Sequence, residues 1–160
     1  GAVPAAEPAD ADRRTADDAE GLLVVEVAPG HRAALPLAAV SRLEELPMTA
    51  VESAGRTDVV QYRDGILPLL RLRSLIGLDA APGAGAEPPE LLSVVVHESD
   101  AGAVGIVIDR VLDVVEEQFV PSEVGRRAGV LGSAVVQGRV TELVDLDVLV
   151  DGLATAGAGR

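Results

Sequence analysis

The stretch Val59–Leu78, VVQYRDGILPLLRLRSLIGL, contains the pattern that decides the fold. Two apolar runs flank Asp64-Gly65, and an Asp-Gly pair between strand-forming residues is typical of a β-hairpin, because a type I′ turn needs positive φ at both central residues. After the hairpin, apolar residues recur at helical spacing from Leu72 to Ile76, and Gly77 ends the run. This predicts a short helix closed by a left-handed residue. The unit is therefore strand, tight turn, strand and short helix.

The same unit occurs a second time near the end of the chain. Aligning residues 69–76 with residues 143–150 matches apolar with apolar and charged with charged side chains at seven of eight positions. The match extends backwards, with offsets of 69 (91 minus 22), 71 (106 minus 35) and 74 (143 minus 69) residues. Because these offsets differ only by loop-sized insertions, we infer two related β subdomains. Chance similarity between Val- and Leu-rich strands is the alternative.

The organisation of the chain follows from this repeat and from changes in composition. We expect an acidic, Ala- and Pro-rich linker at 1–20, a folded β unit at 21–152 split into subdomains 21–78 and 91–152, a connector at 79–90 and a flexible tail at 153–160. The expected strands are 22–28, 32–37, 40–46, 91–97, 103–117 with a bend near Asp109-Arg110, 129–136 and 139–145, followed by a helix at 146–150. A turn at Gln137-Gly138 joins the last two strands and is expected to differ in length from the turn at Asp64-Gly65.

Bulk composition excludes several classes of function. The 160 residues are 48% hydrophobic but only 1% aromatic, so aliphatic side chains must fill a core of sheets. The formal charge of −13 disfavours binding to nucleic acid and to anionic lipid, and no apolar run is long enough for insertion into a membrane. The chain has no cysteine, which excludes disulfides. It begins with Gly1 and its one methionine is Met48, which suggests a piece of a longer protein.

The sequence lacks a convergent set of catalytic groups, so we expect neither an enzyme nor a cofactor. There is no cysteine nucleophile, no Gly-x-Ser-x-Gly motif and no metalloprotease motif. His31 is expected in an exposed loop, and His97 at a strand end where structure rather than chemistry sets the residue. Asp145, Asp147 and Asp151 superficially match a calcium loop, but the residues between them are apolar and no bidentate Glu follows. We therefore expect no metal site.

Several motifs, taken in order, resemble the CheW-like domain family of bacterial chemotaxis. This resemblance covers Leu22 to about Gly152 and implies two pseudo-symmetric, five-stranded, SH3-like barrels packed together, with short helices. The motifs that carry it are Leu35-Pro36-Leu37 with Val40, Tyr62-Arg63-Asp64-Gly65-Ile66-Leu67-Pro68-Leu69-Leu70-Arg71-Leu72, Val104-Gly105-Ile106-Val107-Ile108-Asp109 and Gly132-Ser133-Ala134-Val135-Val136.

Within the family, the amino-acid sequence of the first hairpin looks most like that of the C-terminal regulatory domain of the chemotaxis histidine kinase CheA. Free-standing CheW adaptors usually have an Asn-x-Arg-Gly turn followed by Ile-Pro-Val-x-Asp-Leu. Here the turn is Arg63-Asp64-Gly65 and the next strand contains Leu67 to Leu72. The free-standing CheW-type scaffold adaptor, linking receptors to the kinase, is the alternative.

The resemblance implies a non-catalytic, cytoplasmic docking module associated with membrane-bound receptor arrays through its partners. Its partners would be the CheW adaptor, the cytoplasmic tip of chemoreceptors and the kinase core of the parent chain, and it would couple receptor state to kinase activity. The candidate contact residues are Met48, Tyr62 and Ile66 in the first subdomain, with Leu112 and Val114 in the second. Packing in the core is an equally good explanation for each of them.

Overall fold

The computed structural model describes residues 21–78, 89–100 and 102–151. The predictions for the linker at 1–20 and the tail at 153–160, and most of the connector at 79–90, lie outside the described residues.

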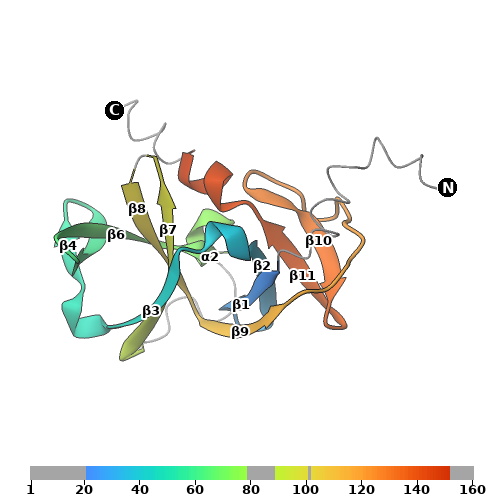
Figure 1. The fold of residues 1–160 in the computed structure, drawn as a ribbon, viewed down its shortest axis with the longest axis horizontal. Coiled ribbons are helices and arrows are strands. Elements are labelled where there is room, and N and C mark those ends of the chain that lie inside the picture. Colours follow the sequence, from blue (N-terminus) through green and yellow to red (C-terminus); the bar gives the residue numbers. More distant parts are fainter. Residues whose placement is uncertain (1–20, 79–88, 101, 152–160) are drawn as a thin grey trace.

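In the described residues, eleven strands form two sheets, each the basis of a small barrel (Figure 1). The five-stranded sheet, called barrel A, has the order β10 (Val130–Val136), β11 (Arg139–Val144), β2 (His31–Pro36), β1 (Leu22–Ala28) and β9 (Arg110–Val115). The six-stranded sheet, called barrel B, has the order β3 (Arg42–Pro47), β7 (Leu91–Ser99), β8 (Gly102–Ile108), β6 (Gly65–Arg71), β5 (Thr57–Tyr62) and β4 (Glu52–Ala54). The all-β fold class is confirmed. Barrel B has one strand more than the expected five, because the short strand β4 pairs with β5 at its edge.

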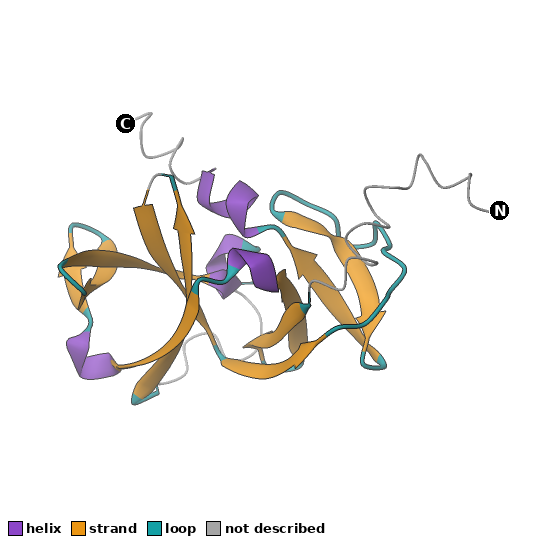
Figure 2. Cartoon of the chain, in the orientation of Figure 1, coloured by secondary structure: helices purple, strands orange, loops and turns teal. Residues whose placement is uncertain are grey.

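Short helices connect the strands. They are η2 (Leu37–Ala39), η3 (Met48–Ala50), α2 (Leu72–Leu75) and a helix at 146–151. Figure 2 shows them gathered where the two sheets meet, with the exception of η3. Two of them, α2 and the helix at 146–151, follow the last strand of each repeat, as the sequence predicts.

Each sheet takes strands from both halves of the chain. β1 and β2 pair with β9 and β11, whereas β3 leaves its own half to pair with β7. The repeat itself is confirmed, because β1, β2 and β11 are arranged like β7, β8 and β6, with a parallel pair at β11·β2 and at β6·β8. Segments 21–78 and 91–152 exchange strands reciprocally, so each barrel contains strands from both sides of the connector. The chain crosses from one barrel to the other at η2, between β2 and β3, and at Asp109, between β8 and β9. At Asp109 the sequence predicts only a bend.

Three apolar cores result from this exchange. A central core between the barrels includes Leu23, Val25, Val27, Leu35, Leu72, Ile76, Val95, Ile106, Val144 and Leu146. The core of barrel A includes Leu22, Val24, Ala34, Ala134, Val136 and Leu143. The core of barrel B includes Val60, Leu67, Leu69, Leu92, Val94 and Val96. Successive side chains of β1 therefore enter different cores, as alternation in a strand requires, and the strand is buried on both faces.

The two hairpin turns have the same length, contrary to expectation. Tyr62 pairs with Gly65, so the loop of the first hairpin is Arg63-Asp64 and not Asp64-Gly65. Only Arg63 has positive φ there, 55°, whereas Gln137 and Gly138 have φ of 56° and 74°. The expected type I′ turn is therefore found in the second hairpin, where glycine occupies a position that needs positive φ.

The helix after β6 ends as the sequence predicts. Gly77 has φ of 82°, the Gly77 amide donates to the Ser74 carbonyl at 3.2 Å, and the Leu78 amide donates to the Arg73 carbonyl at 2.8 Å. This pair of bonds is the Schellman motif, which satisfies carbonyls at a helix end.

The strand exchange predicts how separated halves of the protein behave. Fragments 21–78 and 91–152 expressed alone should each be unfolded, because each lacks strands of both barrels. Mixed in equal amounts, they should recover the sheet signal in circular dichroism and the dispersed amide spectrum of the intact chain. A fragment that folds alone with native chemical shifts would contradict this topology.

Gly105 in β8 predicts a packing limit in barrel B. A Cβ added there would lie 2.8 Å from Val94 Cγ1 and 2.9 Å from Leu69 Cδ2. Gly105→Ala should therefore lower the free energy of unfolding by about 1–3 kcal/mol, measured in urea. Gly65→Ala is the matched control, because no atom lies within 4 Å of its added Cβ, and it should change stability by less than about 0.5 kcal/mol. Equal effects of the two substitutions would contradict the argument.

Candidate protein-interaction surface

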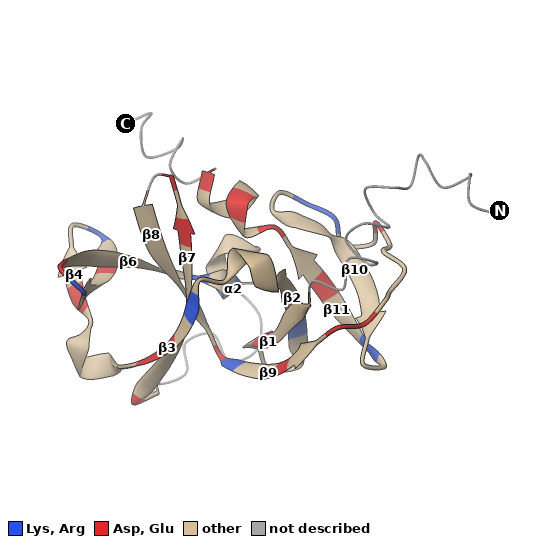
Figure 3. Cartoon of the chain, viewed as in Figure 1, with Lys and Arg blue, Asp and Glu red and all other residues tan. Residues whose placement is uncertain are grey.

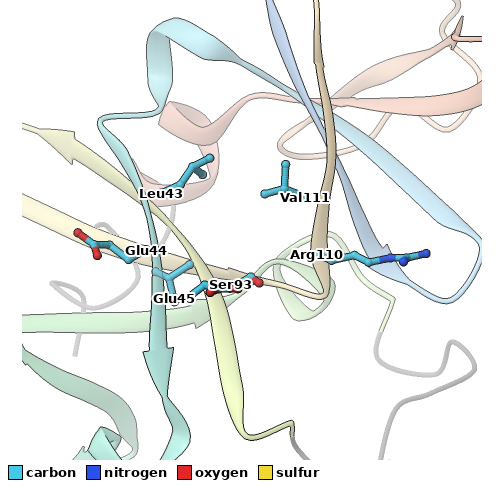
Figure 4. A pocket seen from close by; sticks show the side chains of 7 residues that line it. Leu43, Glu44, Glu45, Ser93, Arg110 and Val111 are labelled. Atoms are coloured by element: carbon cyan, nitrogen blue, oxygen red, sulfur yellow. The ribbon is translucent and has the colours of Figure 1, made fainter.

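A groove lies between β3 and β9, the strands with which each half of the chain crosses to the other barrel. β3 is an edge strand of barrel B and β9 is an edge strand of barrel A. The groove has a volume of about 340 Å³ and is lined by Leu43, Glu44, Glu45, Ser93, Val94, Arg110 and Val111. Figure 4 shows Leu43 and Val111 pointing towards each other from the two strands. The groove thus has one apolar wall from each barrel.

Strand alternation explains which side chains reach the groove. Along β3, Leu43 and Glu45 are exposed, while Leu46 packs against the core of barrel B. Glu44 points away from Val111 (Figure 4), and its Oε2 accepts a hydrogen bond from the Tyr62 hydroxyl at 3.3 Å. Leu43 remains 46% exposed and Val111 38% exposed, although both are large apolar side chains.

The charges around the groove are unequally partnered. Arg110 points away from the groove (Figure 4) and pairs with Glu26, with 3.1 Å between Arg110 Nε and Glu26 Oε1. Burial raises the pKa of Asp109 above its ordinary value, and Arg73, whose Nη2 lies 3.9 Å from Asp109 Oδ2, partly offsets this rise. Within the part of the chain that the structure describes, Glu45 has no hydrogen-bond or ion-pair partner. Figure 3 shows acidic segments on both β3 and β9.

The structure separates the five candidate contact residues into two groups. Met48 and Tyr62 pack against the core of barrel B, and Leu112 packs against the core of barrel A. Ile66 and Val114 are exposed, by 67% and 50%. The five therefore do not form one surface, and contact with a partner remains a prediction for each of them.

Other exposed apolar residues were missed by sequence reasoning. Val120 and Val124 are 85% and 74% exposed in the loop after β9, and Val135 and Val140 face each other on β10 and β11 at 60% and 70% exposure. The signal for Val140 was present, because the offset of 74 residues aligns it with Ile66. Val120 and Val124 have no counterpart in the repeat, and their exposure depends on how the loop is held.

Short backbone bonds fix that loop. Ser122 and Ser133 exchange two backbone hydrogen bonds, of 2.7 and 2.8 Å, and Ser133 Oγ donates to the Val124 carbonyl at 2.9 Å. Gly132 makes this approach feasible, because a Cβ at this position would lie 2.0 Å from the Ser122 carbonyl oxygen. The loop therefore presents its two valines from a supported backbone.

Arg127 joins three elements. Its guanidinium binds both carboxylate oxygens of Glu142, at 2.7 and 3.1 Å, and its Nε donates to the Ile76 carbonyl at the end of α2, at 2.9 Å. The hydrogen bond with Glu142 raises the pKa of Arg127, so the guanidinium stays charged. This contact ties the loop and β11 of barrel A to the helix that follows barrel B.

The histidines and C-terminal carboxylates have structural positions. His97 is buried, and its ring nitrogens lie 2.8 Å from the Ala39 carbonyl oxygen and 3.0 Å from Asp147 Oδ1. Asp145 Oδ1 accepts the Val148 amide at 3.2 Å at the start of the helix at 146–151. His31 is partly buried at the start of β2, so its placement in an exposed loop was wrong. Among the described residues, no three His, Cys, Asp or Glu side chains are grouped to hold a metal.

No helix in the described ranges is both long and apolar enough to cross a membrane.

Comparisons with known proteins agree with this architecture. Residues 21–154 match the model of the CheW-like domain. The chain is also similar to a solved structure, the scaffolding protein TtCheW from Thermoanaerobacter tengcongensis, with a TM-score of 0.65 and 16% sequence identity over 81% of this chain and 86% of that one. At this identity the structural likeness shows the fold alone. No curated protein sequence matches the chain. Since the family match spans both barrels and the strands that cross between them, the chain belongs to the CheW-like domain family of chemotaxis signalling.

Proposed function

We propose that the chain is the regulatory domain of a CheA-type histidine kinase, which docks the adaptor CheW and chemoreceptors in the cytoplasm and couples receptor state to the kinase. The observation that carries the docking role is a groove at the strand exchange, with the exposed apolar side chains of Leu43 from one barrel and Val111 from the other on its two sides. The Arg63-Asp64-Gly65 turn and the Leu67–Leu72 segment support the kinase form of the domain.

A free-standing scaffold adaptor is the second candidate. The scaffolding protein from Thermoanaerobacter tengcongensis shares this fold, and the likeness is equally compatible with both candidates. Both candidates use the same fold and require no chemistry from the chain, so they share the docking surfaces and differ in what is attached to the domain.

The groove suits a helical partner such as the receptor tip. An amphipathic helix inserts apolar residues at three- and four-residue spacing into an apolar groove. Leu43 and Val111 supply opposing contacts for such residues, and the groove is open between them. A contact of this size fits a reversible association within a larger array.

The loop after β9 suits a second partner, the homologous adaptor. Val120 and Val124 are more exposed than any other large apolar residue among the described ones. The Ser122–Ser133 bridge and the contacts of Arg127 hold the loop, so a partner need not order it on binding. Receptor and adaptor would thereby occupy separate surfaces of one domain.

Binding measurements with surface variants test this division. Leu43→Ser with Val111→Ser should weaken binding of a cognate receptor-tip fragment by about tenfold or more, because an apolar anchor in a groove carries much of the affinity. Val120→Ser with Val124→Ser should weaken binding of cognate CheW instead. Val148→Ser removes a comparably exposed apolar group from the helix at 146–151 and is the matched control. Failure of the unmodified chain to bind either partner at high micromolar concentration, measured calorimetrically, would refute the docking role.

The reading frame that precedes the chain distinguishes kinase from adaptor. A histidine-kinase ATP-binding domain encoded in frame before Gly1 is the expected result for the kinase form. A start codon immediately before this region, with no further domain, would establish the adaptor instead.

A further inference from the structure

We infer that Glu45 makes the β3–β9 groove selective for a helix that carries a lysine or arginine beside its apolar stripe. This inference rests on the proposed docking of a helix in the groove and adds the charge that the helix must bring. Glu45 lies on β3 opposite Ser93 of β7, two residues from Leu43, and it lines the groove with both.

The carboxylate of Glu45 has no partner among the described residues, unlike its neighbours. Glu44 is engaged by the Tyr62 hydroxyl, and Arg110 is held by Glu26 on the far side of β9. No cation in the described part of the chain is within ion-pair distance of Glu45, so its exposed carboxylate is hydrated by solvent in the free protein. A helix that covers the groove removes some of this water, and the loss disfavours binding unless the helix supplies a cation.

Charge complementarity therefore defines the occupant. The chain carries a formal charge of −13, which already favours approach of a basic segment. At the groove, Leu43 and Val111 select apolar side chains, and Glu45 beside them selects a basic side chain on the same flank. Arg110 does not compete, because it points away from the groove (Figure 4). An acidic or neutral helix with the same apolar stripe would leave Glu45 covered and unpaired, which is how an interface rejects a wrong partner.

Two synthetic helical peptides test the inference on the intact chain. Both are about 18 residues long with one apolar stripe, and they differ at a single flanking position, arginine in one and glutamate in the other. The unmodified chain should bind the arginine peptide about tenfold more tightly, measured by fluorescence anisotropy at low ionic strength. This preference should shrink as salt rises from about 0.05 to about 0.5 M, because salt screens exposed charges.

Substitutions assign the preference to Glu45. Glu45→Gln should abolish it and Glu45→Arg should reverse it, and neither should alter the urea midpoint by much, since the side chain is exposed. Glu98→Gln removes the same charge from an exposed position near the other end of β7 and should leave the preference intact. A preference that survives in Glu45→Gln, or failure of both peptides to bind, overturns the inference.

The test of charge selection by Glu45 and the test of docking in the groove can fail independently. If Leu43→Ser with Val111→Ser abolishes binding of the receptor-tip fragment while Glu45→Gln changes neither this binding nor the peptide preference, the groove docks a helix but Glu45 does not select it. If the receptor-tip fragment does not bind the unmodified chain, the proposed occupant is wrong, whatever the peptides do.

Discussion

The structure depends on two strands that are buried on both faces. β1 directs Leu22 and Val24 into barrel A and Leu23, Val25 and Val27 into the central core, and β7 similarly divides its side chains between barrel B and the central core. Full burial of such a side chain is worth about 1.5–3 kcal/mol. Displacing either strand would therefore expose two cores at once. Because both faces of each strand are buried, β1 and β7 contain the continuous apolar runs LLVV and VVV.

This constraint also determines where partners can bind. The central strands have no free face, so an apolar contact with another protein must use outer strands or loops. β3 and β9 each lie at the edge of a sheet and keep Leu43 and Val111 partly exposed, at the place where the two barrels meet. His97 and Arg127 also connect the two barrels, since each joins an element of one barrel to a helix or turn beside the other. The groove thus lies between two barrels that share a central core and these contacts.

Much of the fold could be predicted from the sequence, because its signals are local. Hairpins, the helix closed by Gly77 and the internal repeat all depend on neighbouring residues, and the structure confirms them. The exchange of strands could not be predicted this way. A repeat predicts which elements are equivalent, but the same pattern results whether the third strand of each unit stays in its own barrel or crosses to the other. The turn lies at Arg63-Asp64 and not at Asp64-Gly65, because the pairing of Tyr62 with Gly65 sets the register and the Asp-Gly pattern alone does not specify it.

The candidate site was less predictable, for a related reason. Leu43 and Val111 are far apart in the sequence and in separate repeats, and only the crossing of β3 and β9 brings them together. Met48 and Tyr62 are candidate contact residues from the sequence, and in the structure both contribute to packing in barrel B. Ile66 and Val114 are exposed, but contact with a partner remains a prediction for both, because alternation alone does not state which exposed residues share a surface.

The reciprocal exchange has a thermodynamic consequence. Since each barrel lacks strands unless the other half is in place, the two barrels share a single unfolding equilibrium and have no separate stabilities. A ligand that binds only the folded form stabilises everything that folds with it. A partner held at one end of the domain therefore also suppresses local opening at the other end, and occupancy at one surface can be sensed at a second without any change in the mean structure.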